Sequence, residues 1–285
     1  MEHNQASGQQ FSTVIVPKTR ILDFHLKELV RYKDLIFLFV KRSFVTKYKQ
    51  TVLGPSWALI QPLISTLVFT FVFGQIAGLA PGGVPSFLFY MSGNIAWGYF
   101  SGCLNSTANT FTGNAGIFGK VYFPRLVTPI STVLSQLITF GIQFFLFLIF
   151  LVIFWIKGDV HPTMYILMLP ILLLHMALLS LGVGIIISSM TTKYRDLQML
   201  VGFGVSLWMY GTPVAYDIAI VPEKYMSLYM LNPMTPVINA FRKAFLGIGS
   251  FDLPHYLISW GVTLVVVTIG IMLFNRVEKT FMDTV

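Results

Sequence analysis

Two long stretches of this chain carry no ionisable side chain. No Asp, Glu, Lys, Arg or His occurs from Thr51 to Gly119, or from Leu126 to Ile156. Only 11% of the 285 residues are charged, whereas a soluble domain is about 25% charged. With 55% hydrophobic residues and a mean hydropathy of +0.74, a soluble globule would expose more apolar surface than water tolerates. The sequence therefore predicts an integral membrane protein.

Apolar segments of spanning length follow one another along the chain. A helical span needs about 20 apolar residues, and short polar or Gly/Pro-rich turns separate segments of this kind. Residues 217–256 interrupt the series and read as amphipathic, Pro-punctuated helical pieces. The second span has a polar second half, which is expected to face another helix or water. We predict six transmembrane helices, in an all-α protein, at about 56–80, 87–111, 131–156, 164–190, 197–216 and 257–275.

The first fifty residues lie outside these spans. Residues 1–20 are predicted to be a loose tail. In 21–50, apolar residues recur at helical spacing with seven Lys or Arg residues between and beyond them. An apolar stripe with a basic face is typical of a helix lying in the membrane interface.

Lys and Arg are distributed unevenly about the predicted spans. If the N-terminus is cytoplasmic, 15 of the 19 Lys and Arg residues lie on the cytoplasmic side. This agrees with the excess of Lys and Arg in the cytoplasmic loops of membrane proteins. Six spans then place both termini in the cytoplasm, and the loop 112–130 with them. The net charge of +8 is therefore attributed to the Lys and Arg residues that orient the chain in the membrane. No nucleic acid is expected as a partner.

The chain lacks the residues that would supply energy or chemistry. No Asp, Glu, Lys or Arg lies within a predicted span, although ion-coupled transporters usually need such groups there. His175 is read as a hydrogen-bonded packing residue. The pair Gly119-Lys120 has Asn114 where a phosphate-binding loop needs its first glycine. We expect no catalytic residues, metal site or cofactor in this chain, and energy supplied by a partner protein.

Four motifs carry a resemblance to a known family. They are Leu53-Gly-Pro-Ser-Trp-Ala-Leu-Ile-Gln-Pro62, Lys120-Val-Tyr-Phe-Pro-Arg125, Tyr194-Arg-Asp-Leu197 and Leu231-Asn-Pro-Met-Thr-Pro-Val-Ile-Asn-Ala-Phe-Arg242. In this order and spacing they resemble the permease subunit of type-2 ABC exporters, over about residues 25–280. The branch that they are most similar to exports lipid-linked surface polysaccharides such as O-antigen, teichoic acid or capsule.

The resemblance implies a homodimer in the bacterial inner membrane. Two separate ATPase subunits would bind ATP and Mg²⁺, and the interfacial helix and the loop 112–130 would dock on them. The segment 217–256 would fold back as short periplasmic gate helices. O-antigen is the expected substrate. A permease for a drug or another lipid, and a passive channel, remain as alternatives.

The resemblance also suggests roles for particular residues. Arg242 is placed on an outer amphipathic helix, where it would act in a gate or meet a lipid phosphate, with a snorkelling interfacial side chain as the alternative. The residues that would couple the permease to its ATPase are Phe118, Lys120, Tyr122, Phe123 and Arg125.

Aromatic residues in the middle of two predicted spans suggest a path for sugar. A sugar ring has apolar C–H faces that an aromatic ring can support, and such contacts are worth about 0.5–1.5 kcal/mol. Contacts this weak would let a polymer slide, whereas charged contacts would trap it. The alternative is that these rings only pack helices. The candidate lining residues are Trp97, Tyr99, Phe100, Trp208 and Tyr210.

Overall fold

The computed structural model describes residues 26–49, 51–118, 120–121, 123–194 and 196–284, with side chains described between 29 and 277. Every regular element in this described part is a helix, which confirms the predicted all-α class. The first half contains α1 (Leu26–Arg31), α2 (Lys33–Tyr48), η1 (Gly54–Ser56), α3 (Trp57–Phe69), η2 (Thr70–Ile76), α4 (Ser86–Ala108), α5 (Thr110–Phe118) and α6 (Val127–Ile156). The second half contains η3 (Met164–Met168), α7 (Leu169–Thr191), α8 (Leu197–Tyr210), η4 (Ile218–Ile220), α9 (Glu223–Met230), α10 (Met234–Leu246) and α11 (Leu253–Thr284).

Four helical segments are long and apolar enough to cross a bilayer: Gly54–Ile76, Val127–Ile156, Met164–Thr191 and Leu253–Val277. They coincide with four of the six predicted spans. The other two predicted spans are α4, which has 23 residues but a polar second half, and α8, which has 14. The chain is thus a helical membrane protein, and the count of six spans stays a prediction.

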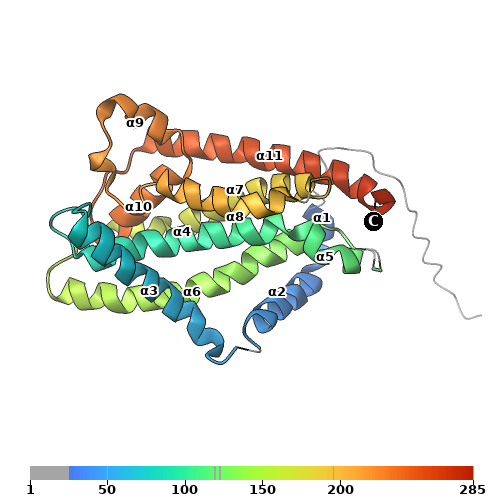
Figure 1. Ribbon diagram of the computed structural model, residues 1–285, viewed down its shortest axis with the longest axis horizontal. Coiled ribbons are helices and arrows are strands. Elements are labelled where there is room, and N and C mark those ends of the chain that lie inside the picture. The colour runs from blue at the N-terminus through green and yellow to red at the C-terminus, as the bar shows by residue number, and fades with distance from the viewer. Residues whose placement is uncertain (1–25, 50, 119, 122, 195, 285) are drawn as a thin grey trace, which may run out of the picture.

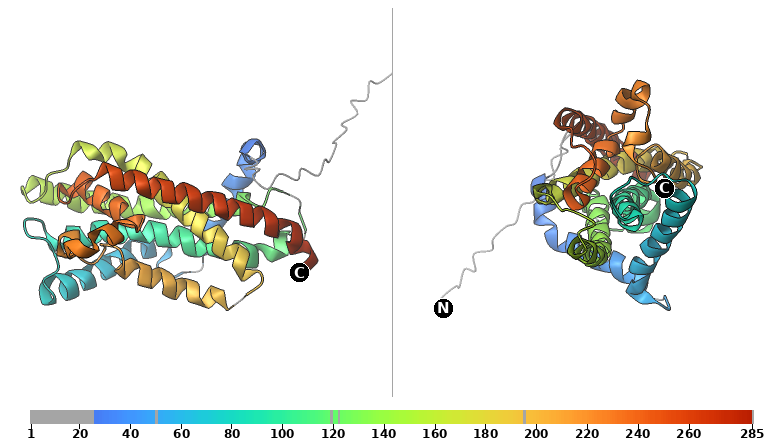
Figure 2. Two further views of the ribbon diagram at one scale, coloured as in Figure 1. Left: turned by 90° about the horizontal axis from the view of Figure 1, so that it is seen from above. Right: turned by 90° about the vertical axis from the view of Figure 1, so that its left-hand side faces the viewer.

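Helix α4 occupies the centre of the bundle. It packs against α3, α6, α7 and α8, while α7 packs along α11 (Figures 1 and 2). Small residues bring these helices together. A Cβ on Gly184 would lie 2.6 Å from Thr107 Cβ, and one on Gly270 would lie 2.8 Å from the carbonyl oxygen of Gly182. Such close approach is common where small residues line helix contacts in membranes.

The predicted interfacial helix is two helices, α1 and α2, separated at Tyr32. Helix α2 packs along α6. It keeps Phe37 and Leu38 exposed, with 75% and 59% of their surface accessible. Lys41 and Arg42 are exposed beside them. Apolar and basic side chains exposed together are consistent with a helix at a membrane surface.

Short helices fill the segment before α11. Helices α9 and α10 lie between α8 and α11, where gate helices were expected, at the left of the bundle in Figure 1. Helix α10 is followed directly by Gly247, which caps its C-terminus with a φ of +75°, a conformation that suits glycine. Nearly all of α10 is buried, against α4, α7 and η3. It therefore belongs to the core of this end of the molecule.

Candidate transport path and coupling surface

The face of α4 that is not buried is uncharged and polar. From Ser92 to Ala108, every aromatic or aliphatic side chain of this helix is buried. The residues that keep surface are Asn94, Gly98, Ser101, Gly102, Asn105 and Ser106. Their spacing of three, four and seven places them on one side of a helix. Asn109, just beyond the helix, continues this side.

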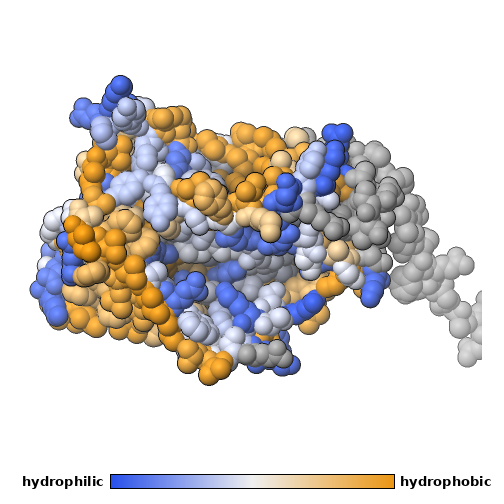
Figure 3. Space-filling model, in the orientation of Figure 1, coloured by the Kyte–Doolittle hydropathy of each residue, from blue (hydrophilic) through white to orange (hydrophobic). Residues whose placement is uncertain are grey.

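Side chains from three neighbouring helices meet this polar face. Asn94 Nδ2 lies 3.3 Å from Thr66 Oγ1 of α3, and Gln136 Nε2 of α6 donates to Ser106 Oγ at 2.9 Å. At the far end, Gln198 Nε2 of α8 donates to Asn109 Oδ1 at 2.5 Å. Figure 3 shows the molecule hollowed along the middle of this view, with hydrophilic residues in and beside the hollow.

The polar face offers hydrogen bonds without charge. Its amides supply both donors and acceptors, and its hydroxyls do the same. A helix of membrane-spanning length does not turn such a face to lipid, because unsatisfied polar groups are costly in hydrocarbon. The arrangement suits contact with water or with a neutral polar substrate. We call Asn94, Ser101, Asn105, Ser106 and Gln136 the α4 polar face.

The structure buries three of the five aromatic residues that the sequence grouped as a conduit. Trp97, Tyr99 and Phe100 are buried inside the subunit, with at most 6% of their surface accessible. Trp97 and Phe100 contact each other and Trp208, and Tyr99 packs on Phe140. These three rings lie on the core side of α4, away from its polar face.

Trp208 and Tyr210 lie on α8 and are more accessible. Trp208 is half-buried, and its Nε1 donates to Asn232 Oδ1 at 2.9 Å, which ties α8 to the start of α10. Tyr210 has 54% of its surface accessible. Of the five aromatic candidates, Tyr210 is therefore the one with a ring free to meet a substrate from the surface of a single subunit.

Arg242 lies in the core of the segment 217–256. Only 3% of its surface is accessible. Its guanidinium donates to the carbonyl oxygens of Pro213 at 2.5 Å, Val214 at 2.8 Å and Tyr216 at 3.3 Å. These carbonyls belong to the turn that follows α8. Arg242 thus fastens this turn to α10, and in this conformation its charge is not presented to a lipid phosphate.

The aromatic residues of the predicted coupling loop anchor it to its neighbours. Phe118 and Phe123 are buried, and their ring centres lie 5.8 Å apart. Phe123 also packs edge-on against Phe39 of α2 at 5.7 Å. Through Phe111, which stacks on Phe274 at 4.6 Å, the same cluster reaches α11. The loop is therefore joined to α2 and to the last helix.

Lys120, Val121 and Arg125 of the loop differ in how much of their surface is exposed. Lys120 is exposed, as is Val121 with 59% of its surface accessible. Arg125 is partly buried, and its guanidinium lies 5.5 Å from the centre of the Phe118 ring. Tyr122 lies outside the described residues. Among the described residues from 118 to 125, the exposed ones that a partner could contact are thus Lys120 and Val121.

No cluster of three or more His, Cys, Asp or Glu that could hold a metal ion occurs among the described residues.

The α4 polar face is the feature that the sequence-based site prediction missed. The sequence shows that this span has a polar second half, but the prediction does not place residues 94, 101 and 105 on one side of a helix. Their helical spacing was the signal available in the sequence.

Comparisons with known proteins identify relatives along most of the chain. The O-antigen export system permease protein RfbA of Klebsiella pneumoniae is 25% identical over 252 residues, which cover 88% of this chain and 94% of that protein. RfbA of Myxococcus xanthus is 26% identical over 77% of this chain and 83% of its own length. The polysialic acid transport protein KpsM of Escherichia coli is 24% identical over 85% and 93%. The ABC-2 type transporter family profile matches residues 34–246. The chain therefore belongs to the ABC-2 type transporter family.

Proposed function

We propose that this chain is the permease subunit of an ATP-driven exporter that moves a lipid-linked surface polysaccharide, O-antigen in the first instance, across the bacterial inner membrane. The α4 polar face carries the proposal, because it is an uncharged hydrogen-bonding surface within a membrane bundle. Likeness to O-antigen export permeases along most of the chain supports the choice of substrate.

The chemistry of the α4 polar face suits a moving glycan. Sugar hydroxyls exchange hydrogen bonds with amides and hydroxyls, and each exchange nets only about 0.5–1.5 kcal/mol. Hydrogen bonds to charged groups are roughly twice as strong and would hold a polymer in place. Asn94, Asn105 and Gln136 would therefore guide the chain past α4 without trapping it.

In a single subunit the residues of this face keep part of their surface accessible, and the molecule is hollowed along its middle (Figure 3). A second copy related by a two-fold axis would close it, because the same surface would then face itself. We therefore propose a homodimer whose two α4 polar faces line one path. Tyr210 on α8 would lie at its edge.

Energy would enter through two separate ATPase subunits that bind ATP and Mg²⁺. Lys120 and Val121 would contact the ATPase directly, and Phe118 and Phe123 would pass movement to α2 and α11. This arrangement requires both termini and the loop 112–130 to be cytoplasmic. Reporter fusions at residue 117 and after residue 284 test it, and periplasmic activity of either would contradict it.

Deletion of the gene, followed by complementation, tests the proposed function. The mutant should lose surface polysaccharide, accumulate lipid-linked glycan inside the cell, and recover with the wild-type chain. Both lipopolysaccharide and capsule are to be measured, since the relatives are named for O-antigen export and for polysialic acid transport. Unchanged surface glycan would contradict the proposal. Export that persists when the partner ATPase is inactivated by mutation would indicate a passive channel.

A further inference from the structure

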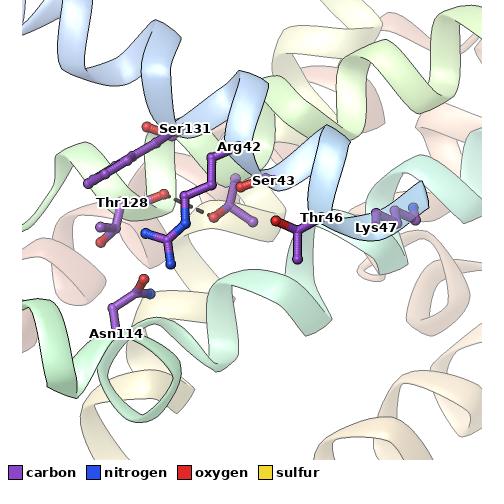
Figure 4. Close-up of a pocket in the computed structure, with 9 residues that line it drawn as sticks. Arg42, Ser43, Thr46, Lys47, Asn114, Thr128 and Ser131 are labelled. Atoms are coloured by element: carbon purple, nitrogen blue, oxygen red, sulfur yellow. Dashed lines mark hydrogen bonds between the residues drawn. The ribbon is translucent and has the colours of Figure 1, made fainter. Parts of the chain in front are cut away.

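A polar cavity of about 370 Å³ lies where α2, α5 and α6 meet, apart from the α4 polar face. Helix α2 supplies one side of it through Arg42, Ser43, Thr46 and Lys47 (Figure 4). Asn114 of α5 and the first turns of α6 supply the other. The α6 side chains Thr128 and Ser131 are buried, whereas the α2 side chains are exposed. The cavity is thus closed by α6 and accessible along α2.

The charge in this cavity is entirely positive. Arg42 and Lys47 are the ionisable residues that line it, and no carboxylate is among the described lining residues. Within the described part of the chain, neither cation forms an ion pair. In Figure 4 the Arg42 guanidinium extends into the space between Thr128 and Asn114. Arg42 therefore presents a positive charge inside the cavity, and Lys47, beyond Thr46 in Figure 4, adds a second charge at its edge.

The hydrogen-bond donors available to a ligand come from α2. At the start of α6, the amides of Val127 and Thr128 already donate to Pro124 and Arg125. The hydroxyl of Thr128 donates to the carbonyl oxygen of Arg125 at 2.8 Å, and Ser131 likewise donates within its own helix. A ligand would thus be held chiefly by Arg42, with the hydroxyls of Ser43 and Thr46 beside it and Lys47 at the edge of the cavity. Guanidinium and ammonium groups prefer phosphate oxygens.

We propose that this cavity binds the phosphate or pyrophosphate head group of a membrane lipid. Its volume falls within the range of about 300–1,000 Å³ seen for small-ligand sites. It opens along α2, the helix whose exposed apolar and basic residues mark it as interfacial, which is the depth at which head groups lie. Two lipids carry this chemistry: the lipid-linked glycan, on the basis of the proposed function, and anionic phospholipid.

Binding to the purified full-length chain in detergent tests the proposal without ATPase or glycan. The probes are farnesyl pyrophosphate, farnesol as its phosphate-free counterpart, phosphatidylglycerol and phosphatidylcholine, measured by native mass spectrometry and calorimetry. The test variant is the double substitution Arg42→Gln with Lys47→Gln. The matched control is Lys41→Gln with Lys49→Gln, which removes the same charge from exposed positions of the same region that do not line the cavity.

The wild-type chain should bind farnesyl pyrophosphate and not farnesol. The test variant should bind it about tenfold or more weakly, since charge-assisted bonds are lost, while the control stays within about threefold of the wild type, as a screened surface charge should. Ser43→Phe, which fills the open side without changing the charge, should also weaken binding. Folded protein levels and thermal unfolding of each variant confirm that the helix is intact.

The outcome with phospholipid distinguishes the two sources. Binding of pyrophosphate without phosphatidylglycerol assigns the cavity to the lipid-linked substrate, and comparable binding of both assigns it to anionic head groups in general. Equal losses in the test and control variants would overturn the proposal, since binding would then follow net charge alone. Normal lipid binding with weakened ATPase association in the test variant would also overturn it and make this a protein contact. Because no export is measured, failure here leaves the proposed function standing.

Discussion

The guanidinium carbon of Arg242 lies 3.6 Å from the centre of the Phe89 ring. This contact joins α10 to α4, within the distance at which cation–π attraction operates. Gly93 makes room for it, because a Cβ at that position would lie 2.9 Å from Arg242 Nη2. The buried charge of Arg242 is thus held by one ring and three carbonyl oxygens, in space that a glycine leaves open.

Replacement of Arg242 by Leu should destabilise the folded protein. The carbonyls of Pro213, Val214 and Tyr216 would lose their donor, and one buried unsatisfied group costs about 1–3 kcal/mol. Arg242→Lys should recover only part of the lost stability. Its ammonium keeps the charge and donates hydrogen bonds, but it cannot reach all three oxygens as the planar guanidinium does. Thermal unfolding in detergent measures this. Lys243→Gln, a partly exposed neighbour, is the control, and equal unfolding temperatures for Arg242→Leu and wild type would contradict the assignment.

Glycines on α7 and α8 should differ sharply in their tolerance of alanine. Gly184→Ala places a methyl group 2.6 Å from Thr107 Cβ, and overpacking of this kind typically costs about 1–3 kcal/mol. Gly204→Ala on α8 meets nothing within 4 Å and should be neutral or slightly stabilising. The yield of folded protein and the unfolding temperature report the difference. The same stability for both variants would mean that α4 and α7 are not in close contact at this point.

Asn105→Leu should reduce glycan export without loss of folded protein. The side chain keeps part of its surface on the α4 polar face, so the substitution removes hydrogen bonds from the path and leaves the core alone. Asn105→Gln retains the amide and should export more than the Leu variant. Surface glycan per amount of permease is the measurement. Normal export by Asn105→Leu would remove this residue from the proposed path.

Substitutions in the loop 112–130 should have two different effects, one at exposed residues that contact the ATPase and another at buried residues that hold the loop in place. Lys120→Ala with Val121→Ala should weaken ATPase association by about two- to fivefold, the scale of an exposed charge contact, and leave stability unchanged. Phe123→Ala should instead lower stability by about 3–5 kcal/mol, as for a buried Phe. Co-purification of the ATPase and thermal unfolding distinguish these effects. Tight ATPase binding by the first variant would place the docking surface elsewhere.

The sequence by itself determined the class of protein and the course of its helices. Stretches without charge, such as Thr51 to Gly119, exclude a soluble fold, since only a bilayer accommodates them. The turns and prolines that bound these stretches located α3, α6, α7 and α11 along the chain. The short helices of 217–256 followed from the same signals, because proline and loop chemistry are local properties of the chain.

Only the tertiary structure decided which way each side chain faces. Lipid and the protein core are both apolar, so hydropathy does not distinguish a ring that faces lipid or a path from a ring that packs inside. Trp97, Tyr99 and Phe100 therefore read as lining residues in the sequence, yet lie in the core. Arg242 read as a surface cation because its partners are carbonyls 26–29 positions away along the chain. They come close only because the fold places the turn after α8 beside α10.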